Sequence, residues 1–217
     1  MVTVREVVEE IIKKSPFIEE GIAKDLINLS ALAREIQPMV QDELLKDVQE
    51  GAIVMALKRL APQISNKFTH LQAIIKNIGD ITVKSNLVDF TYVNSETFFE
   101  NVKTLINKIS KTKDKFFTIT QGVSETTIII NADFIDEVKK IFKDEEQVLM
   151  FENLSSITAK LPSENINVPG VYYTILKLLA WDGINIVDAV STSNEITCIF
   201  RDQDIDNAFS VFKRLTQ

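Results

Sequence analysis

The loop Asn167-Val168-Pro169-Gly170-Val171 combines residue types that suit the binding of a small anion. An apolar pattern of helical length follows from Tyr172 to Ala180, so this loop is expected to open onto a helix N-terminus. The first N–H groups of a helix have no partner within it and carry partial positive charge, so they attract carboxylates. Pro169 suits the first helical position because a helix start has no use for its missing N–H, and Gly170 lets a ligand or another backbone approach closely.

The segment after this helix has residues that end it and begin a strand. Gly183 lies just past the last periodic residue, where a left-handed cap is expected, and Ile184 to Val190 indicates a strand. Together, Val168-Pro169-Gly170-Val171, the helix, Gly183-Ile184-Asn185-Ile186 and Ser191-Thr192-Ser193 resemble an ACT domain, the small amino-acid-sensing module. The resemblance is greatest to the regulatory ACT domains of aspartate kinases. It covers about residues 156–215 and is weaker before them.

The resemblance implies a small ligand, such as an amino acid, at the interface of paired ACT domains. Its carboxylate would meet the loop 167–171, and its ammonium would meet carbonyls and side chains near residues 185 and 191–193. The candidate ligand-binding residues are Asn167, Val168, Pro169, Gly170, Val171, Asn185, Ile186, Ser191, Thr192 and Ser193. A plain βαβ packing unit without a ligand is the alternative.

The sequence departs from aspartate kinases at two places. Asn165-Ile166-Asn167 precedes the loop in place of the family's usual approach, and Asn194 stands where a Glu often follows Thr-Ser. The Lys-Phe-Gly-Gly signature that opens a kinase catalytic domain is missing from the sequence, so the resemblance does not imply kinase activity. We expect a regulatory protein, not an enzyme.

Composition argues against several other chemistries. One cysteine, Cys198, excludes an internal disulfide and a cysteine-based metal cluster, and one histidine, His70, excludes a histidine-based metal site. The six glycines are isolated, so no phosphate-binding loop is expected. Two acidic groups, 133–137 and 202–206, lie at predicted helix starts, where acids favour the helix dipole. We therefore expect no catalytic residue, metal or cofactor.

The charge and hydropathy patterns bear on partners and location. A net charge of −7 argues against a general nucleic-acid or anionic-membrane surface. The N-terminal residues are charged from Arg5 onward and lack the apolar core of a signal peptide, and no apolar run has membrane-spanning length. A cytoplasmic protein without membrane contact is the simplest expectation.

Residues 1–78 are predicted to form a helical domain. Thr3 and Glu6 have the spacing of a capping box, Ser15-Pro16 restarts a helix, and Asn28 can cap another. Pro38 and Pro62 are expected to interrupt or end helices. The helices are expected at about residues 3–14, 16 onward, 29–36, 39–45, 49–60 and 68–78.

The remaining chain predicts an α+β fold of two ferredoxin-like βαββαβ, ACT-like modules, residues 79–152 and 153–217. The first has strands at 81–83, 87–92, 116–120, 126–130 and 147–151, with helices from 95 and 133. The second has strands at 156–161, 184–190 and 196–200, with helices at 169–181 and 204–215. No clear fourth strand follows Leu215, which would leave an open sheet edge. Either the first module of the same chain or a partner chain could cover this edge, and a homodimer is expected.

Two other functions stay open. Helices 29–36 and 49–60 resemble a helix-turn-helix, which would make the protein an ACT-containing transcription regulator with Gln49, Lys58 and Arg59 reading DNA. Residues 1–66 hold 8 Lys or Arg against 11 Asp or Glu, so DNA binding is possible but not favoured. A purely structural dimerisation module is the other alternative.

Overall fold

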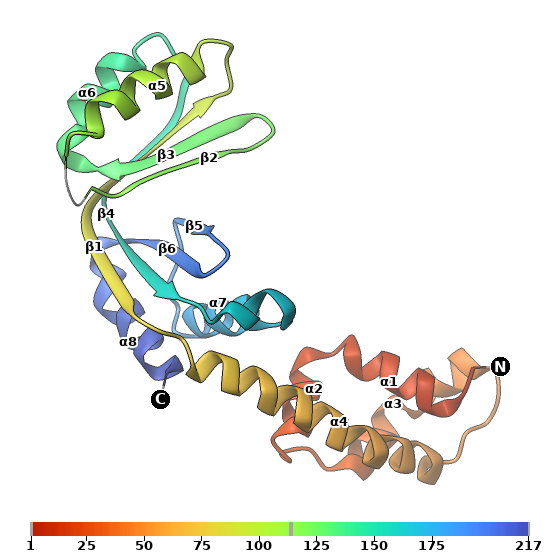
Figure 1. The fold of residues 1–217 in the computed structure, drawn as a ribbon. Helices are drawn as coiled ribbons and strands as arrows, with labels where there is room; N and C mark the ends of the chain where they lie inside the picture. The colour runs from red at the N-terminus through yellow and green to blue at the C-terminus, as the bar shows by residue number, and fades with distance from the viewer. Residues whose placement is uncertain (1, 113–114, 217) are drawn as a thin grey trace. The chain divides into compact units, whose positions relative to one another are not determined.

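The computed structural model of this chain describes residues 2–112 and 115–216, so the outermost residues of the predicted domains, 1 and 217, lie outside it. The chain forms two units, one that extends to Ala73 and one that begins at Ile74. Each is described by itself below. The first contains helices, and the second combines helices with a six-stranded antiparallel sheet (Figure 1).

The described part of the first unit contains α1 (Val4–Lys13), α2 (Pro16–Ala23), α3 (Leu29–Leu44) and most of α4 (Glu50–Lys76), whose last three residues belong to the second unit. The capping box predicted for Thr3 and Glu6 is present, because each side chain accepts a hydrogen bond from the other's backbone N–H. The Asn28 side chain accepts from the N–H groups of Ser30 and Ala31, as a helix cap should. The helices share one apolar core, which includes Val8, Ile12, Ala33, Val40, Ile53 and Leu57.

The two prolines predicted to interrupt or end helices lie inside them. Pro38 is within α3 and Pro62 within α4. A proline in a helix interior costs about 3 kcal/mol. In α3 the buried apolar face continues from Ile36 before Pro38 to Val40 after it, which offsets that cost. The short helices expected at 29–36 and 49–60 are therefore parts of helices of 16 and 27 residues.

The sheet of the second unit has the strand order β2-β3-β1-β4-β6-β5. Its strands are β1 (Ile81–Val93), β2 (Phe117–Gln121), β3 (Glu125–Asn131), β4 (Gln147–Lys160), β5 (Asp188–Ser191) and β6 (Glu195–Arg201). Its α-helices are α5 (Phe98–Ile109), α6 (Ile135–Ile141), α7 (Val171–Trp181) and α8 (Ile205–Leu215), with short 3-10 turns at Ala132–Phe134, Ser163–Asn167 and Asp202–Asp204. Figure 1 shows α5 and α6 against the half of the sheet that holds β2 and β3, and α7 and α8 against the half that holds β5 and β6.

The two central strands, β1 and β4, each run through both halves of the sheet. The sequence predicts two separate strands in each of these segments, but the structure joins them. Leu87–Val93 pairs with β3, whereas Ile81–Lys84 pairs with residues 156–159 of β4. The half of the sheet that holds β5 and β6 therefore obtains its fourth strand from the start of β1. The open edge expected beside this part of β4 does not exist, and the predicted division at residue 152 falls inside β4.

Two asparagines allow the central strands to pass from one half to the other. Asn86 and Asn153 both have positive φ, at 59° and 57°. Asn86 lies in the register shift between Lys84 and Leu87, and Asn153 just precedes Leu154, the partner of Leu87. Asn tolerates this left-handed conformation better than most residues, and a β-bulge of this kind bends its strand. The two leucines are fully buried and pack with Ile129 and Ile199 where the halves meet.

Asn153→Ala should lower the free energy of unfolding by about 1 kcal/mol, because alanine pays the full steric cost of a left-handed backbone. Asn153→Gly should be close to the natural protein, because glycine adopts positive φ freely. Urea denaturation of both variants checks this. Equal losses for the two variants would show that the side chain and not the backbone conformation matters.

Candidate functional site

The candidate site is built at the start of α7, where Gly170 fixes the end of the preceding loop. Gly170 has φ of 100°, a conformation that side-chain-bearing residues rarely adopt. This conformation is not helical, so α7 begins at Val171 and Pro169 precedes the helix. The prediction that Pro169 occupies the first helical position is therefore wrong by two residues.

The N-terminus of α7 is open. Gly170 provides no side-chain cap, and the first turn of the helix has no acidic residue. The first N–H of the helix with a backbone acceptor is that of Thr174, which donates to the Gly170 carbonyl at 2.9 Å. Within the described residues, no protein acceptor is found for the N–H groups of Val171, Tyr172 and Tyr173. These groups are available to an anion.

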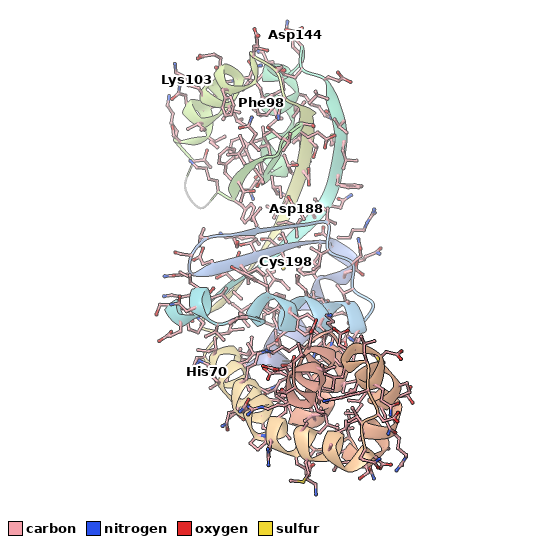
Figure 2. The ribbon with its side chains drawn as sticks, turned by 90° about the vertical axis from the view of Figure 1, so that its right-hand side faces the viewer. His70, Phe98, Lys103, Asp144, Asp188 and Cys198 are labelled. Carbon is pink, nitrogen blue, oxygen red and sulfur yellow. The ribbon has the colours of Figure 1, made fainter. Side chains whose placement is uncertain are left out.

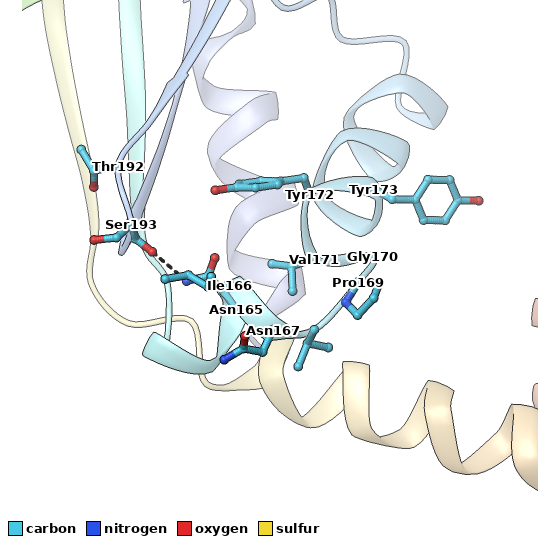
Figure 3. A pocket seen from close by; sticks show the side chains of 11 residues that line it. Asn165, Ile166, Asn167, Pro169, Gly170, Val171, Tyr172, Tyr173, Thr192 and Ser193 are labelled. Carbon is cyan, nitrogen blue, oxygen red and sulfur yellow. Dashed lines mark hydrogen bonds between the residues drawn. The ribbon is translucent and has the colours of Figure 1, made fainter.

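The loop before α7 is held against the β5–β6 turn. Asn165 is buried, with 7% of its surface exposed, and its amide nitrogen donates to the carbonyls of Pro162 at 2.7 Å and Ser193 at 2.9 Å (Figure 3). The Leu161 N–H donates to the Asn194 carbonyl at 2.6 Å. These hydrogen bonds place the turn beside the loop, so both can line one pocket.

That pocket has a volume of about 460 Å³. It is lined by Asn165, Ile166, Asn167, Val168, Pro169, Gly170, Val171, Tyr172, Tyr173, Thr192 and Ser193 (Figure 3). The structure thus brings together seven of the ten candidate residues, namely 167–171, 192 and 193. Its lining contains no acidic or basic side chain, so the helix N-terminus dominates the local electrostatics.

Three candidate residues do not line this pocket. Asn185 and Ile186 follow the C-terminal end of α7, whereas the pocket lies at its N-terminal end. Eleven helical residues span about 16 Å, which separates the two ends. Ser191 instead lines a second groove, between β2 and the β5–β6 hairpin.

Four lining residues were not among the sequence candidates. Tyr172 and Tyr173 belong to the apolar pattern of α7, but they are 40% and 45% exposed. Adjacent residues of a helix point in different directions, so two neighbouring tyrosines cannot both lie on its buried face. This spacing was the signal in the sequence that at least one of them is exposed. Asn165 and Ile166 gave no signal beyond their place before the loop.

The C-terminal end of α7 follows the prediction. Gly183 has φ of 72° and donates its N–H to the Ala180 carbonyl at 3.1 Å, while the Ile184 N–H donates to the Leu179 carbonyl at 2.9 Å. This is the Schellman arrangement. The strand expected from Ile184 starts only at Asp188, because the chain must first return from the helix to the sheet.

A second polar region lies on the face of the sheet away from its helices. Val88, Phe90 and Tyr92 pack against α5 and α6, so the alternation of a strand turns Asp89 and Thr91 to the other face. Asp89 is only 4% exposed. Its carboxylate accepts a hydrogen bond from the Thr91 hydroxyl at 3.3 Å. Burial, and secondarily the charge of Asp188, raises the pKa of Asp89 to about 6.

The groove near this region has a volume of about 420 Å³ and is rich in threonine. Its lining includes Thr118, Thr120, Thr158, Thr192 and Thr197. Within the described residues, the buried hydroxyls of Thr118 and Ser156 have no hydrogen-bond partner. Cys198 lies in the same half of the sheet as Asp188 (Figure 2), and burial raises its pKa to about 12. It is therefore a buried, unreactive thiol.

The described residues contain no cluster of three or more His, Cys, Asp or Glu side chains that could hold a metal ion. Over the same residues, no helix is long and apolar enough to cross a membrane.

Comparison with solved structures shows what this fold is similar to. The regulatory subunit of aspartate kinase from Thermus thermophilus matches with a TM-score of 0.53 and 12% identity, over 64% of this chain and 99% of that one. The Clostridium acetobutylicum aspartate kinase matches with a TM-score of 0.54 and 13% identity, over 64% of this chain and 34% of that one. Escherichia coli aspartokinase III, solved with lysine and aspartate, matches with a TM-score of 0.50 and 11% identity, over 33% of its length.

The matched folds are aspartate kinase regulatory domains, which are ACT domains. The resemblance predicted from the sequence is thereby confirmed at the level of fold. The match spans only about a third of the complete kinases, and it reaches their regulatory and not their catalytic part. No protein-family model and no curated protein matches the sequence.

Asp89→Asn should stabilise the protein at neutral pH, by about 1–2 kcal/mol. The carboxyl titrates near 4 when unfolded and about 6 when folded, so its contribution to stability falls as pH rises through this window and stays unfavourable above it. The natural protein should lose stability between pH 4 and 7 relative to the variant. Chemical denaturation across this range measures the difference, and a constant difference would contradict the assignment.

Proposed function

We propose that this chain is a non-catalytic regulatory protein that binds an amino acid at the N-terminus of α7. The observation that supports this most is the open helix start beside a pocket without charged side chains. A ligand carboxylate there would accept hydrogen bonds from the N–H groups of Val171, Tyr172 and Tyr173. Its ammonium group would lie near the polar groups of Asn167 and Thr192.

The lining also favours one kind of ligand. No acidic side chain lines the pocket to pair with a cationic ligand side chain, and no basic one to pair with an anionic side chain. Ile166 and Tyr172 provide apolar surface instead. We therefore expect a neutral, apolar amino acid to bind better than lysine or aspartate.

The proposal includes the domain layout and the assembly. Residues up to about 78 would form a helical domain, followed by two ACT modules that exchange the ends of β1 and β4. With residues 156–159 of β4 paired on both sides, the outermost strands of the sheet are β2 and β5, each of five residues or fewer. In the described residues, Ile81–Lys84 of β1 and the part of β4 before Leu154 also pair with one strand only. Pairing of β5 with β5 of a second copy would bring two pockets to one interface between ACT modules.

The DNA-binding alternative gains no support from the first unit. Lys58 and Arg59 are exposed on α4, but they lie in a unit with an excess of acidic residues. A purely structural dimerisation role would leave the open start of α7 without a use.

Gly170→Val should abolish the thermal stabilisation that an amino acid gives the natural protein, because a branched side chain obstructs the N–H groups. The matched control is Gly183→Val at the other end of α7, which also has positive φ. Each variant should lose stability on the order of 1–2 kcal/mol from backbone strain. A melting-temperature screen with the common amino acids should show a response in the control only. A response kept by Gly170→Val would remove this loop from the site.

The chain should be a dimer at micromolar concentration, with a mass twice 24.6 kDa by light scattering. The Thr192 N–H bonds to the Glu195 carbonyl, so strand alternation turns the N–H of Ser191 toward the open edge. Ser191→Pro removes a donor that only an intermolecular ladder would use. This variant should have the monomer mass with its helical content unchanged, and a monomeric natural protein would contradict the assembly.

A further inference from the structure

The two halves of the sheet have the same local construction, in which a strand, a loop and a helix follow one another. In the half with α5, the Asn94 N–H donates to the Ser124 carbonyl at 2.9 Å. In the half with α7, the Leu161 N–H donates to the Asn194 carbonyl at 2.6 Å. Both loops are thus tied to the turn of the neighbouring hairpin, so α5 and α7 begin at equivalent places.

The start of α5 differs from that of α7 because a carboxylate already lies there. One oxygen of Glu145 accepts a hydrogen bond from the Ser95 hydroxyl at 2.5 Å. The other accepts from the Thr97 hydroxyl at 2.8 Å and from the Asn101 amide at 2.6 Å. Thr97 is the residue that precedes the first turn of α5, and Asn101 belongs to that helix. Figure 2 labels Phe98 and Asp144, the sequence neighbours of Thr97 and Glu145.

Glu145 is held in its charged form. Burial acts to raise the pKa of Glu145, but the hydrogen bonds from Ser95, Thr97 and Asn101 outweigh it and lower the pKa below its usual value. Burial, and secondarily the charge of Glu145, raises the pKa of the nearby Tyr92 to about 12. Both carboxylate oxygens are therefore engaged at neutral pH, as those of a bound amino acid would be.

The start of α7 has the opposite character. The loop before it, from Leu161 to Gly170, is longer than the segment from Asn94 to Thr97 before α5. This longer loop forms the pocket, and no acidic side chain lines that pocket or lies in the first turn of α7. One half of the sheet thus supplies its own carboxylate, and the other leaves the equivalent place open.

We propose that Glu145 is a built-in ligand of the half that holds α5, so that an external carboxylate binds only at α7, once in each chain. The single-site conclusion rests on the function proposed for α7, whereas the occupation of α5 by Glu145 does not. Glu145 thereby determines which of the two equivalent helix starts responds to an effector.

The test uses small carboxylates to replace the missing side chain. Gly170→Val serves as the background because it closes the α7 site. Glu145→Ala and, as the matched control, Glu146→Ala are each added to it in the full chain. Glu146 is exposed, and its backbone carbonyl, which accepts from the Val93 N–H, is kept in the alanine variant. Melting temperatures are measured in sodium acetate and in sodium chloride of equal ionic strength.

The Glu145→Ala variant should melt below the background, and acetate should raise its melting temperature. The expected rise is about 2–4 °C at roughly five times the dissociation constant of acetate. The background and the Glu146→Ala variant should show no rise beyond that in chloride. An equal acetate response in all three proteins overturns the proposal.

Two further comparisons cover a variant that does not fold and separate this proposal from the function proposed for α7. If Glu145→Ala does not fold, Glu145→Gln is compared with Glu146→Gln; the former should melt lower, and equal melting overturns the proposal. A different measurement shows whether the function proposed for α7 is wrong. In that case, amino acids would change the melting temperatures of the natural protein and of Gly170→Val equally. That outcome leaves the acetate comparison at Glu145 unaffected.

Discussion

The antiparallel pairing of β1 with β4 is the interaction on which the rest of the second unit depends. Each strand serves both halves of the sheet, and the fully buried pair Leu87 and Leu154 lies where the halves meet. Left-handed conformations at Asn86 and Asn153 let the strands bend there. β1 leads into the loop before α5, and β4 leads into the loop before α7. The starts of the two helices therefore occupy equivalent places in the two halves of the sheet, so their residues can be compared directly.

Local chemistry made much of this fold predictable. The caps at Thr3, Asn28 and Gly183 depend on contacts within a few residues, and the structure has all three. Features set by distant partners were not predictable. Pro62 stays inside α4 although its local cost is unfavourable, and Ile81–Lys84 pairs with a strand more than seventy positions later. A pattern of separate strands also suggested an open edge that long-range pairing closes.

In the candidate site, too, features set by neighbouring residues were predictable and features set by distant residues were not. The loop 167–171 was identified because proline, glycine and a following apolar helix indicate a helix start, and the structure places that loop in a pocket. Asn185 was added through family resemblance, and α7 separates it from the pocket. The role of Glu145 had no sequence signal, because Ser95, Thr97 and Asn101 reach it across a gap of more than forty residues.

The central claim is that the backbone N–H groups at the start of α7 hold a ligand carboxylate. Amide chemical shifts from NMR, recorded while the amino acid with the largest thermal effect is added, test it most directly. The largest changes are expected at Val171, Tyr172 and Tyr173, with small changes at the start of α5, where Glu145 already lies. Binding that shifts amides elsewhere and leaves those three unchanged would contradict it.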